Sequence, residues 1–255
     1  MHIYDITIQA TLRPELLERT LSSHVKHLFG PCIEKARLIM NIDLVGCDSS
    51  VMDEKLNQIY HIIDKYPFHD FKINECREPN FAHAWFWCME QLESDLFFNL
   101  EEDWEMTMDL DFKKMIDMMN KHPRLAHLRL SSFISTNVTC KNWNKFLGWN
   151  GEFFEVKSED KCVIGWCGHP SLNKTVFMNE CLPLMDRNAN PEKQIKGRRF
   201  KHPMNDILDY WRFGSFHPQN AKKAVIDIGR AWMTKNGYIK KGNKAFFTEW
   251  ERVKN

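Results

Sequence analysis

The spacing of apolar residues in the first half of the chain predicts strands and helices in alternation. Residues 3–9 alternate between apolar and polar types and are rich in isoleucine, which is typical of a strand. Pro14 then predicts the first turn of a helix that runs to about residue 27, with Thr11 as a candidate N-cap. Residues 36–45 form a nearly continuous apolar run, which predicts a buried parallel strand that ends at Gly46.

The alternation continues to residue 130 and predicts an α/β fold, a three-layer sandwich around a mostly parallel central sheet. Further helices are predicted at residues 51–65, 80–92 and 110–121, and further strands at residues 71–76, 95–100 and 125–130. Residues 131–187 lose the regular pattern, and their Asn, Gly, Trp and Ser residues indicate short strands and loops that we interpret as an insertion. Residues 188–200 are polar and basic and predict a mobile loop, which precedes helices at residues 205–211 and 220–235.

The composition is that of a globular protein with a full core. Of the 255 residues, 43% are apolar and 13% are aromatic, which excludes a disordered or fibrous chain. No apolar run reaches the roughly 20 residues that cross a bilayer, so we expect no membrane span. The N-terminus leads directly into a predicted strand, which favours a cytoplasmic protein. The eight cysteines include no CxxC pair, which favours reduced, buried thiols.

Charge is distributed unevenly along the chain. Residues 193–255 carry 15 Lys and Arg against 5 Asp and Glu, a net charge of +10, which leaves −9 for residues 1–192. The basic quarter predicts an anionic contact: a phosphate group, a nucleic acid or the acidic part of the same chain. Neutralisation within the chain and an external partner both stay open.

Three consecutive carboxylates, those of Glu101, Glu102 and Asp103, follow a predicted buried strand. Like charges in a half-buried place repel one another, so the cluster is costly unless a cation lies among them. Open α/β sheets bind ligands outside the carboxyl ends of their strands, and hard oxygen ligands suit Mg²⁺ or Mn²⁺ on a diphosphate. The alternative is a helix that begins near Asp103 and favours acidic residues in its first turn.

The order of these motifs resembles that in GT-A nucleotide-sugar glycosyltransferases. The run Thr11-x-Arg13-Pro14-x-Leu16-Leu17 after the first strand is similar to the opening of that fold. The run Glu101-Glu102-Asp103-Trp104-Glu105, with Asp111-Phe112 further on, is similar to its acidic motif in N-acetylglucosaminyltransferases. Asn80-x-x-x-Ala84 matches a family 2 pattern less closely, because Ala82 replaces a glycine. The resemblance covers residues 3–130 and implies a GT-A-like, Rossmann-type fold.

The resemblance also implies separate roles for the two halves of the chain. Residues 1–130 would bind the nucleotide sugar, and residues 131–255 would bind the acceptor within the same catalytic domain. Asp103 would ligate Mn²⁺ or Mg²⁺ on the donor diphosphate, with Glu102 near the ribose or a metal-bound water and Glu101 in support. Thr11 and Arg13 would line the pocket of the nucleotide base.

Three further residues are candidates for nucleotide binding by this resemblance. Asp43 ends the second predicted strand, where the fold commonly contacts the base, and its alternative role is to cap the strand end. Arg77 and Asn80 follow the third predicted strand. Arg77 has the alternative of pairing with Glu75 or Glu78.

An inverting sugar transfer needs a carboxylate base that takes the proton of the acceptor hydroxyl. The candidates are Glu192, Asp206 and Asp209. Family 2 enzymes often place this base at a helix start after a Trp- and Gly-rich acceptor loop, here residues 165–172, and Glu192 fits that order best. A solvated loop carboxylate is the alternative.

Late histidine and basic residues complete the implied site. His217 matches, by its order, the late histidine that many GT-A enzymes supply to the metal, and a surface histidine is the alternative. The basic run, which would hold the donor diphosphate in a loop that orders over the donor, comprises Lys193, Lys196, Arg198, Arg199 and Lys201.

Other motifs carry less chemistry. Cys162, Cys167 and His169 are zinc-ligand types, but their spacing lacks the usual short pair. The tryptophans of the irregular region, which are candidates for stacking on a sugar or base, are Trp143, Trp149 and Trp166. The aromatic residues expected in the core are Trp85, Trp87, Phe97 and Phe98.

The sequence therefore predicts a metal-dependent, inverting glycosyltransferase of the hexosyltransferase type, with a nucleoside-diphosphate sugar, expected to be a UDP-sugar, as donor. An acceptor glycan and a hydroxylated nucleic-acid base, of the kind that some viral transferases modify, both stay open. The rival hypothesis is a non-catalytic α/β protein that binds nucleic acid through the basic quarter. Nucleotidyl transfer is not favoured, because no Gly-rich loop follows the first strand.

Overall fold

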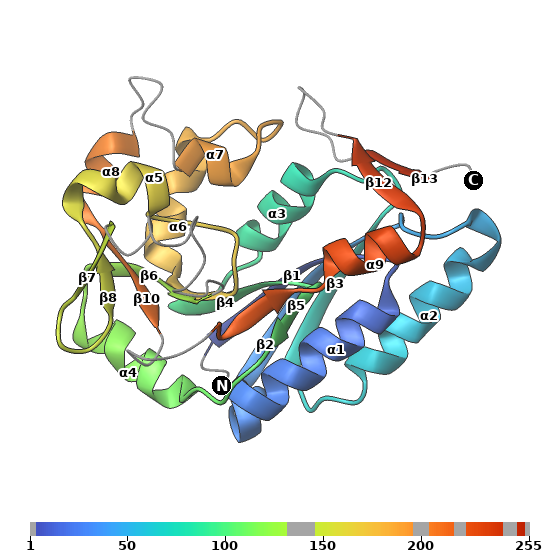
Figure 1. Cartoon of the computed structure of the whole chain (residues 1–255), viewed down its shortest axis with the longest axis horizontal. Coiled ribbons are helices and arrows are strands. Elements are labelled where there is room, and N and C mark those ends of the chain that lie inside the picture. Colours follow the sequence, from blue (N-terminus) through green and yellow to red (C-terminus); the bar gives the residue numbers. More distant parts are fainter. Residues whose placement is uncertain (1–3, 132–145, 196–203, 217–222, 242–248, 253–255) are drawn as a thin grey trace.

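The computed structural model describes residues 4–131, 146–195, 204–216, 223–241 and 249–252. Its centre is a nine-stranded sheet with the order β3-β2-β1-β4-β9-β6-β10-β8-β7 within these residues (Figure 1). The strands are β1 (Tyr4–Thr11), β2 (Ala36–Asp43), β3 (Asp70–Cys76), β4 (Leu96–Glu101), β6 (Leu125–Leu130), β7 (Leu147–Trp149), β8 (Phe154–Val156), β9 (Ser171–Lys174) and β10 (Arg212–Phe216).

The sheet is parallel on one side and mixed on the other. β3, β2, β1 and β4 are parallel neighbours, as are β6 and β10. β9 lies between β4 and β6 and is antiparallel to both. The ribbon of β7 and β8 joins the sheet antiparallel to β10.

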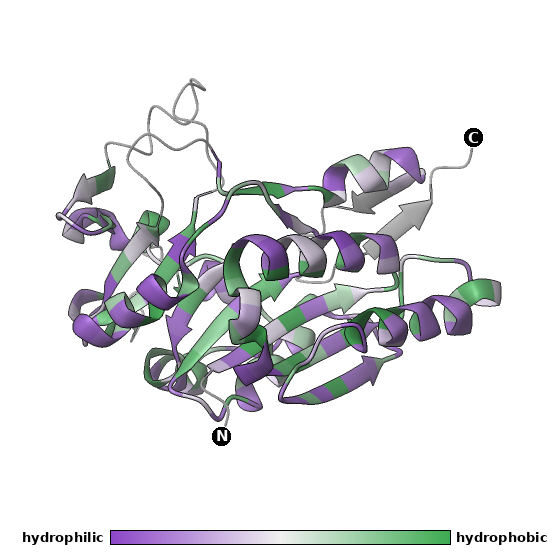
Figure 2. Ribbon diagram, turned by 90° about the horizontal axis from the view of Figure 1, so that it is seen from below, coloured by the Kyte–Doolittle hydropathy of each residue, from purple (hydrophilic) through white to green (hydrophobic). Residues whose placement is uncertain are grey.

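Helices cover both faces of the sheet and complete three layers (Figure 1). They are α1 (Pro14–His24), α2 (Met52–Ile63), α3 (Phe81–Glu90), α4 (Phe112–Lys121), α5 (Lys161–Ile164), α6 (Thr175–Cys181), α7 (Pro191–Ile195), α8 (Met204–Tyr210) and α9 (Gly229–Lys235). Hydrophobic and hydrophilic residues are interspersed along the helices that flank the sheet, as expected for helices with one apolar side (Figure 2). In the described residues, no helix is long and apolar enough to cross a membrane.

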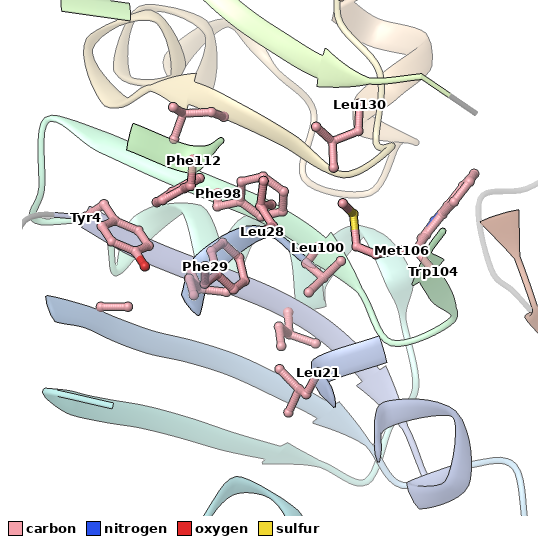
Figure 3. Packing of buried hydrophobic residues seen from close by; sticks show 14 of the residues in the cluster. Tyr4, Leu21, Leu28, Phe29, Phe98, Leu100, Trp104, Met106, Phe112 and Leu130 are labelled. Atoms are coloured by element: carbon pink, nitrogen blue, oxygen red, sulfur yellow. The ribbon is translucent and has the colours of Figure 1, made fainter. Parts of the chain in front are cut away.

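Two apolar clusters lie on opposite faces of the sheet. The first packs α1, α2 and α4 on β1, β2 and β4, and Figure 3 shows Phe29, Phe98 and Phe112 packed together there. The second packs α3 and α6 against the other face through Trp85 and Phe177. Successive strand residues point to opposite faces, so one strand serves both clusters.

The face under α3 also carries a row of polar side chains. Thr7 of β1 donates its hydroxyl to Asn99 of β4 at 3.3 Å. Asn74 of β3 donates to Asn41 of β2 at 2.7 Å, and Asn41 donates to Asp43 at 2.9 Å. Because buried polar groups are costly without partners, these bonds hold the row in place as it approaches the carboxyl ends of the strands.

The C-terminal part of the described chain returns to the first half. β11 (Val225–Asp227) pairs antiparallel with β5 (Trp104–Met106), which follows β4. α9 comes directly after β11 and lies beside α1 (Figure 1). β12 (Tyr238–Lys241) and β13 (Glu249–Arg252) form a separate antiparallel ribbon.

The predicted α/β class, with its mostly parallel central sheet, is confirmed, and so are the elements predicted before residue 130, within a few residues at each end. Thr11 as the N-cap of the first helix is wrong, because Thr11 ends β1 and Arg13 occupies the N-cap position. The helix predicted at residues 205–211 is confirmed as α8. The seven described cysteines are all free thiols, and Cys140 lies outside the described residues.

Several predictions for residues 131–255 differ from the structure. The segment interpreted as an insertion contributes β9 to the middle of the main sheet. The helix predicted at residues 220–235 is instead β11 followed by the shorter α9, because pairing with β5 holds residues 225–227 extended. Part of the predicted mobile loop forms α7, and residues 196–200 lie outside the described residues.

His24 at the end of α1 is a fully buried imidazole whose Nδ1 bonds with the carbonyl oxygen of Thr20 at 2.8 Å. Burial lowers the pKa of His24 to about 4. An unfolded histidine titrates near pH 6.5, so between these values the unfolded state binds a proton more readily than the folded state. Stability is therefore lost as the pH falls below about 6.5.

We expect the free energy of unfolding to fall by about 2 kcal/mol between pH 7 and pH 5 through His24 alone. His24→Phe should remove this contribution, since a phenyl ring fits beside Phe29 and Phe98, whose ring centroids each lie 6.1 Å from that of His24. Denaturant unfolding of both proteins at the two pH values measures the difference. An equal loss in the variant and the wild type would contradict the assignment.

Candidate active site

The carboxyl ends of β1, β2 and β4 meet at one edge of the sheet. Thr11 is in register with Asp43, and Gln9 with Glu101. Residues 101–103, here called the acidic turn, lead from the end of β4 into β5 and lie at this edge. Glu102 and Asp103 form a turn and β5 follows them directly, so the alternative in which a helix begins near Asp103 is wrong.

Glu102 points inward and is bound by Thr11 and Arg13. Its Oε1 accepts the backbone N–H of Thr11 at 3.1 Å, the Thr11 hydroxyl at 2.9 Å and the Arg13 Nε at 3.0 Å. Arg13 Nη2 also forms an ion pair with Glu102, and both side chains are 4% exposed. The turn is further held by the Thr20 hydroxyl, which donates to the Glu102 carbonyl at 2.7 Å. The three predicted donor-site residues Thr11, Arg13 and Glu102 are thus brought together, in contact with one another.

Arg13 is the cation that lies among the carboxylates. Its Nη2 is 3.2 Å from Asp103 Oδ2 in addition to its contact with Glu102. Burial, and then the charge of Glu102, raise the pKa of Asp103 to about 6, although Arg13 acts in the opposite direction. Burial, and then the charge of Asp103, raise the pKa of Glu101 to about 8. Three carboxyl groups therefore share one guanidinium, and the raised pKa values show that their negative charges are costly at this place.

This surplus of carboxyl groups over cations is the feature that fits a divalent cation. In the described part of the chain, no three His, Cys, Asp or Glu side chains form a metal site by themselves. Asp103 and Glu101 nevertheless offer hard carboxylate oxygens, which suit Mg²⁺ or Mn²⁺ whose remaining ligands come from a diphosphate. His217 lies outside the described residues, so its role as a ligand stays a prediction.

Asp43 and Asn80 tie β2 to the start of α3. Asp43 accepts Asn41 Nδ2 at 2.9 Å and the backbone N–H of Asn80 at 3.2 Å. The Asn80 side chain caps α3 by accepting the backbone N–H groups of Ala82 and His83. Burial raises the pKa of Asp43 to about 6 despite these bonds. Both residues have a positioning role here, and their contact with a nucleotide stays a prediction, as does that of the exposed Arg77.

A loop of residues 165–170 faces the acidic turn from the other half of the chain. The His169 ring lies 4.8 Å from the Trp104 ring, between centroids, and the Trp104 indole N–H donates to Glu101 Oε2 at 3.0 Å. Asn99 of β4 donates to the Gly168 carbonyl at 2.9 Å, which fixes the loop on the sheet. The loop therefore borders the side of the acidic turn on which Glu101 lies.

The same loop carries a buried thiol with basic neighbours. Cys167 Sγ is 3.6 Å from His127 Nε2 and 3.8 Å from Arg129 Nη1. Asn173 Oδ1 is 2.7 Å from His127 Nδ1, which fixes the imidazole so that Nε2 faces the thiol. Burial alone would raise the pKa of Cys167, but His169, His127 and Arg129 together hold it well below its usual value. The sequence analysis did not predict this cluster. Its signal in the sequence was the presence of two polar residues, His127 and Arg129, in an otherwise apolar predicted strand.

Among the candidate bases, Glu192 is one whose charge acts on a residue of this loop, His169. Glu192 lies in the first turn of α7 and is partly exposed. Burial lowers the pKa of His169, but Cys167 and, to a smaller extent, Glu192 raise it above its usual value. Asp206 and Asp209 are exposed on α8, where the Asp209 carbonyl accepts Lys161 Nζ of α5 at 2.8 Å. Their catalytic roles stay predictions.

The remaining candidates divide between the core, the surface and the undescribed segments. Trp166 is 1% exposed and packs on Trp85, so it belongs to the core and not to an acceptor surface. Trp149 is exposed on β7. The candidates that lie outside the described residues are Trp143, Lys196, Arg198, Arg199, Lys201 and His217.

The fold is similar to that of solved glycosyltransferase structures. The mannosyltransferase PcManGT from Pyrobaculum calidifontis, in complex with GDP-Man and Mn²⁺, matches with a TM-score of 0.55 and 10% sequence identity, over 85% of this chain and 55% of that chain. S. aureus TarS 1–349 matches with a TM-score of 0.57 and 10% identity, over 88% of this chain and 60% of that chain. The same protein in complex with UDP-GlcNAc matches with a TM-score of 0.52 and 11% identity, over 87% of this chain and 57% of that chain.

At this identity the likeness shows the fold alone. The chain has the GT-A fold of nucleotide-sugar glycosyltransferases, as its motifs predicted. It spans between 55% and 60% of the length of these three structures. No protein-family model matches the chain, and no curated protein matches it.

Arg13→Ala should destabilise the protein by about 3–5 kcal/mol, because it leaves the Glu102 carboxylate buried without its guanidinium. Arg19→Ala is the matched control, since it breaks an ion pair with Glu105 in which the Arg19 side chain is 53% exposed, and it should cost less than about 1 kcal/mol. Denaturant unfolding of both variants measures the contrast. Equal losses in the two variants would contradict the role given to the buried pair.

Proposed function

We propose that this chain is a metal-dependent, inverting glycosyltransferase that moves a sugar from a nucleoside-diphosphate sugar to an acceptor hydroxyl. The observation that carries the proposal is the cluster of three carboxyl groups that share one guanidinium at the carboxyl edge of a GT-A sheet. Asp103, with Glu101 in support, would hold Mn²⁺ or Mg²⁺ there. When bound, the cation would supply positive charge to the diphosphate as it leaves.

The residues of the chain have separate tasks in this proposal. Glu192 takes the proton of the acceptor hydroxyl, whose oxygen forms a bond to the anomeric carbon of the sugar. The bond between that carbon and the diphosphate breaks, and the diphosphate leaves with the electron pair. Arg13 keeps the acidic turn in one conformation through Glu102, so that Asp103 is preorganised. His217, Arg198 and Arg199 would complete the metal and diphosphate contacts.

The class of donor is supported by what two structural neighbours bind. PcManGT is described with GDP-Man and Mn²⁺, and TarS with UDP-GlcNAc. A nucleoside-diphosphate sugar is therefore the donor class that we propose here, with a UDP-sugar first among the candidates. The net charge of +10 in residues 193–255 suits an anionic donor, and it equally suits an anionic acceptor such as a nucleic acid with hydroxylated bases. A glycan acceptor is the other candidate.

Titration of nucleoside diphosphates with and without Mn²⁺ tests the donor site through thermal unfolding. One diphosphate should raise the unfolding midpoint on the order of 5 °C at a concentration of about 100 times its Kd, and only with the metal present. Asp103→Asn should lose this rise, whereas Asp109→Asn, whose carboxylate is 87% exposed, should keep it. No rise with any nucleotide, together with salt-dependent binding of DNA or RNA, would favour the rival nucleic-acid-binding function.

Glu192→Gln should lower kcat for sugar transfer by about 10²–10⁴-fold, since the amide cannot take the acceptor proton. The metal-dependent rise with the donor diphosphate should remain, because Glu192 does not touch the acidic turn in this proposal. Asp206→Asn and Asp209→Asn serve as matched comparisons for the two other candidate bases. A large loss of kcat in either of them, with Glu192→Gln active, would transfer the role of base to that residue.

A further inference from the structure

The segment of residues 224–238, here called the C-terminal segment, lies directly on the acidic turn. β11 places Asp227 in register with Trp104 of β5. The backbone N–H of Ile228 donates to the Asp103 carbonyl at 2.9 Å. Figure 1 shows α9 of this segment beside α1, which carries Arg13 at its N-cap. Residues from opposite ends of the chain are thus joined at the candidate donor site.

Gly229 leaves room for the Asp103 carboxylate. A Cβ atom at position 229 would lie 2.1 Å from Asp103 Oδ2 and 2.8 Å from its Cγ, which no real side chain tolerates. Gly229 is also fixed in place, since its N–H donates to Asp227 Oδ1 at 2.9 Å. Any larger residue would therefore push the carboxylate away from its present position beside Arg13.

Trp232 covers the other side of Arg13. The guanidinium carbon of Arg13 lies 5.5 Å from the Trp232 ring centroid, within the range of a cation–π contact. The Trp232 indole N–H donates to Glu15 Oε1 at 2.6 Å, which fixes the ring on the first turn of α1. The Tyr238 ring stacks on Trp232 with centroids 5.5 Å apart and an interplanar angle of 10°. Arg13 therefore lies between this aromatic pair and the carboxylates.

These contacts add little to the apolar core. Of the seven residues of α9, Gly229 is the one that is buried, and the Trp232 side chain is only partly covered. A helix of this kind gains little from hydrophobic burial. Its specific contacts go instead to Arg13, Asp103 and Glu15, which lie at the candidate donor site or next to it.

We propose that the C-terminal segment is a component of the donor site, in which Trp232 positions Arg13 and Gly229 positions the Asp103 carboxylate. This inference rests on the proposed function of the acidic turn. Trp232 limits the conformations of the Arg13 side chain to the one that spans Glu102 and Asp103. Gly229 admits the carboxylate close to the backbone of α9, so that Asp103 has one position in which to meet the donor and its cation.

The test compares Trp232→Ala, Trp232→Phe and Gly229→Ala by titration of the nucleoside diphosphate with Mn²⁺ and by kinetics of transfer. Trp232→Ala should weaken diphosphate binding about tenfold and raise KM for the donor by a similar factor, with kcat changed less. Trp232→Phe keeps an aromatic face over Arg13 and should restore most of the affinity. Gly229→Ala should weaken metal-dependent binding more than Trp232→Ala does, since it displaces Asp103 itself.

Tyr210→Ala is the matched control, because it removes another ring that lies over an arginine, with Arg124 Cζ 4.7 Å from the ring centroid and away from the acidic turn. It should leave diphosphate affinity unchanged. The inference is overturned if Trp232→Ala and Gly229→Ala bind the diphosphate as the wild type does. It is also overturned if Trp232→Phe is as weak as Trp232→Ala while both unfold at the wild-type midpoint without ligand, since the ring over Arg13 would then not matter.

A second measurement separates this inference from the proposed function. If the wild type binds no nucleoside diphosphate, the proposed function and the donor part of the inference both fail. A double-mutant cycle of Trp232→Ala and Arg13→Lys in denaturant unfolding then decides whether Trp232 holds Arg13. Non-additive losses support the contact, and additive losses overturn it.

Discussion

The buried ion pair between Arg13 and Glu102 is the interaction on which the candidate site depends. It joins the N-cap of α1 to the turn after β4, and both side chains are 4% exposed. A buried pair of this kind adds little net stability compared with apolar packing, yet its loss is costly because one charge would stay buried alone. The main consequence of the pair is therefore that it fixes the position of the acidic turn. The ion pair holds the acidic turn in one conformation, and this conformation sets the orientation of the Glu101 and Asp103 carboxyl groups.

Three adjacent carboxylates have different surroundings because of this pair. Glu102 is turned inward and satisfied by Thr11 and Arg13. Asp103 shares Arg13, and Glu101 accepts only the Trp104 indole N–H among the described contacts. Glu101 and Asp103 are thus the carboxyl groups of the acidic turn that the protein satisfies least, and in the proposed function a divalent cation would lie between them and the anionic donor.

The first half could be predicted from the sequence because local pattern and final fold agree there. Apolar runs became buried strands, and Pro14 began α1 as expected. β9 was not predicted because a four-residue strand between two longer ones has no periodicity of its own. The relation of Gly229 to Asp103 was invisible for another reason: it depends on the pairing of β11 with β5, which brings distant parts of the chain together. The inward turn of Glu102 likewise depends on Arg13.

The basic character of the C-terminal quarter is not explained by its attachment to the acidic turn. In the described residues, that attachment uses the Ile228 N–H, the bare backbone of Gly229 and the Trp232 ring, none of which is cationic. The described ion pair of Arg230 with Asp227 lies within the segment itself, and the Arg230 side chain is 92% exposed, so it contributes little. Arg212 of β10, by contrast, forms an ion pair with Glu155 of β8, so part of the positive charge of residues 193–255 is neutralised within the chain. In the proposed function, an external anion, whether the diphosphate of a donor or a polyanionic acceptor, is a further partner for this charge.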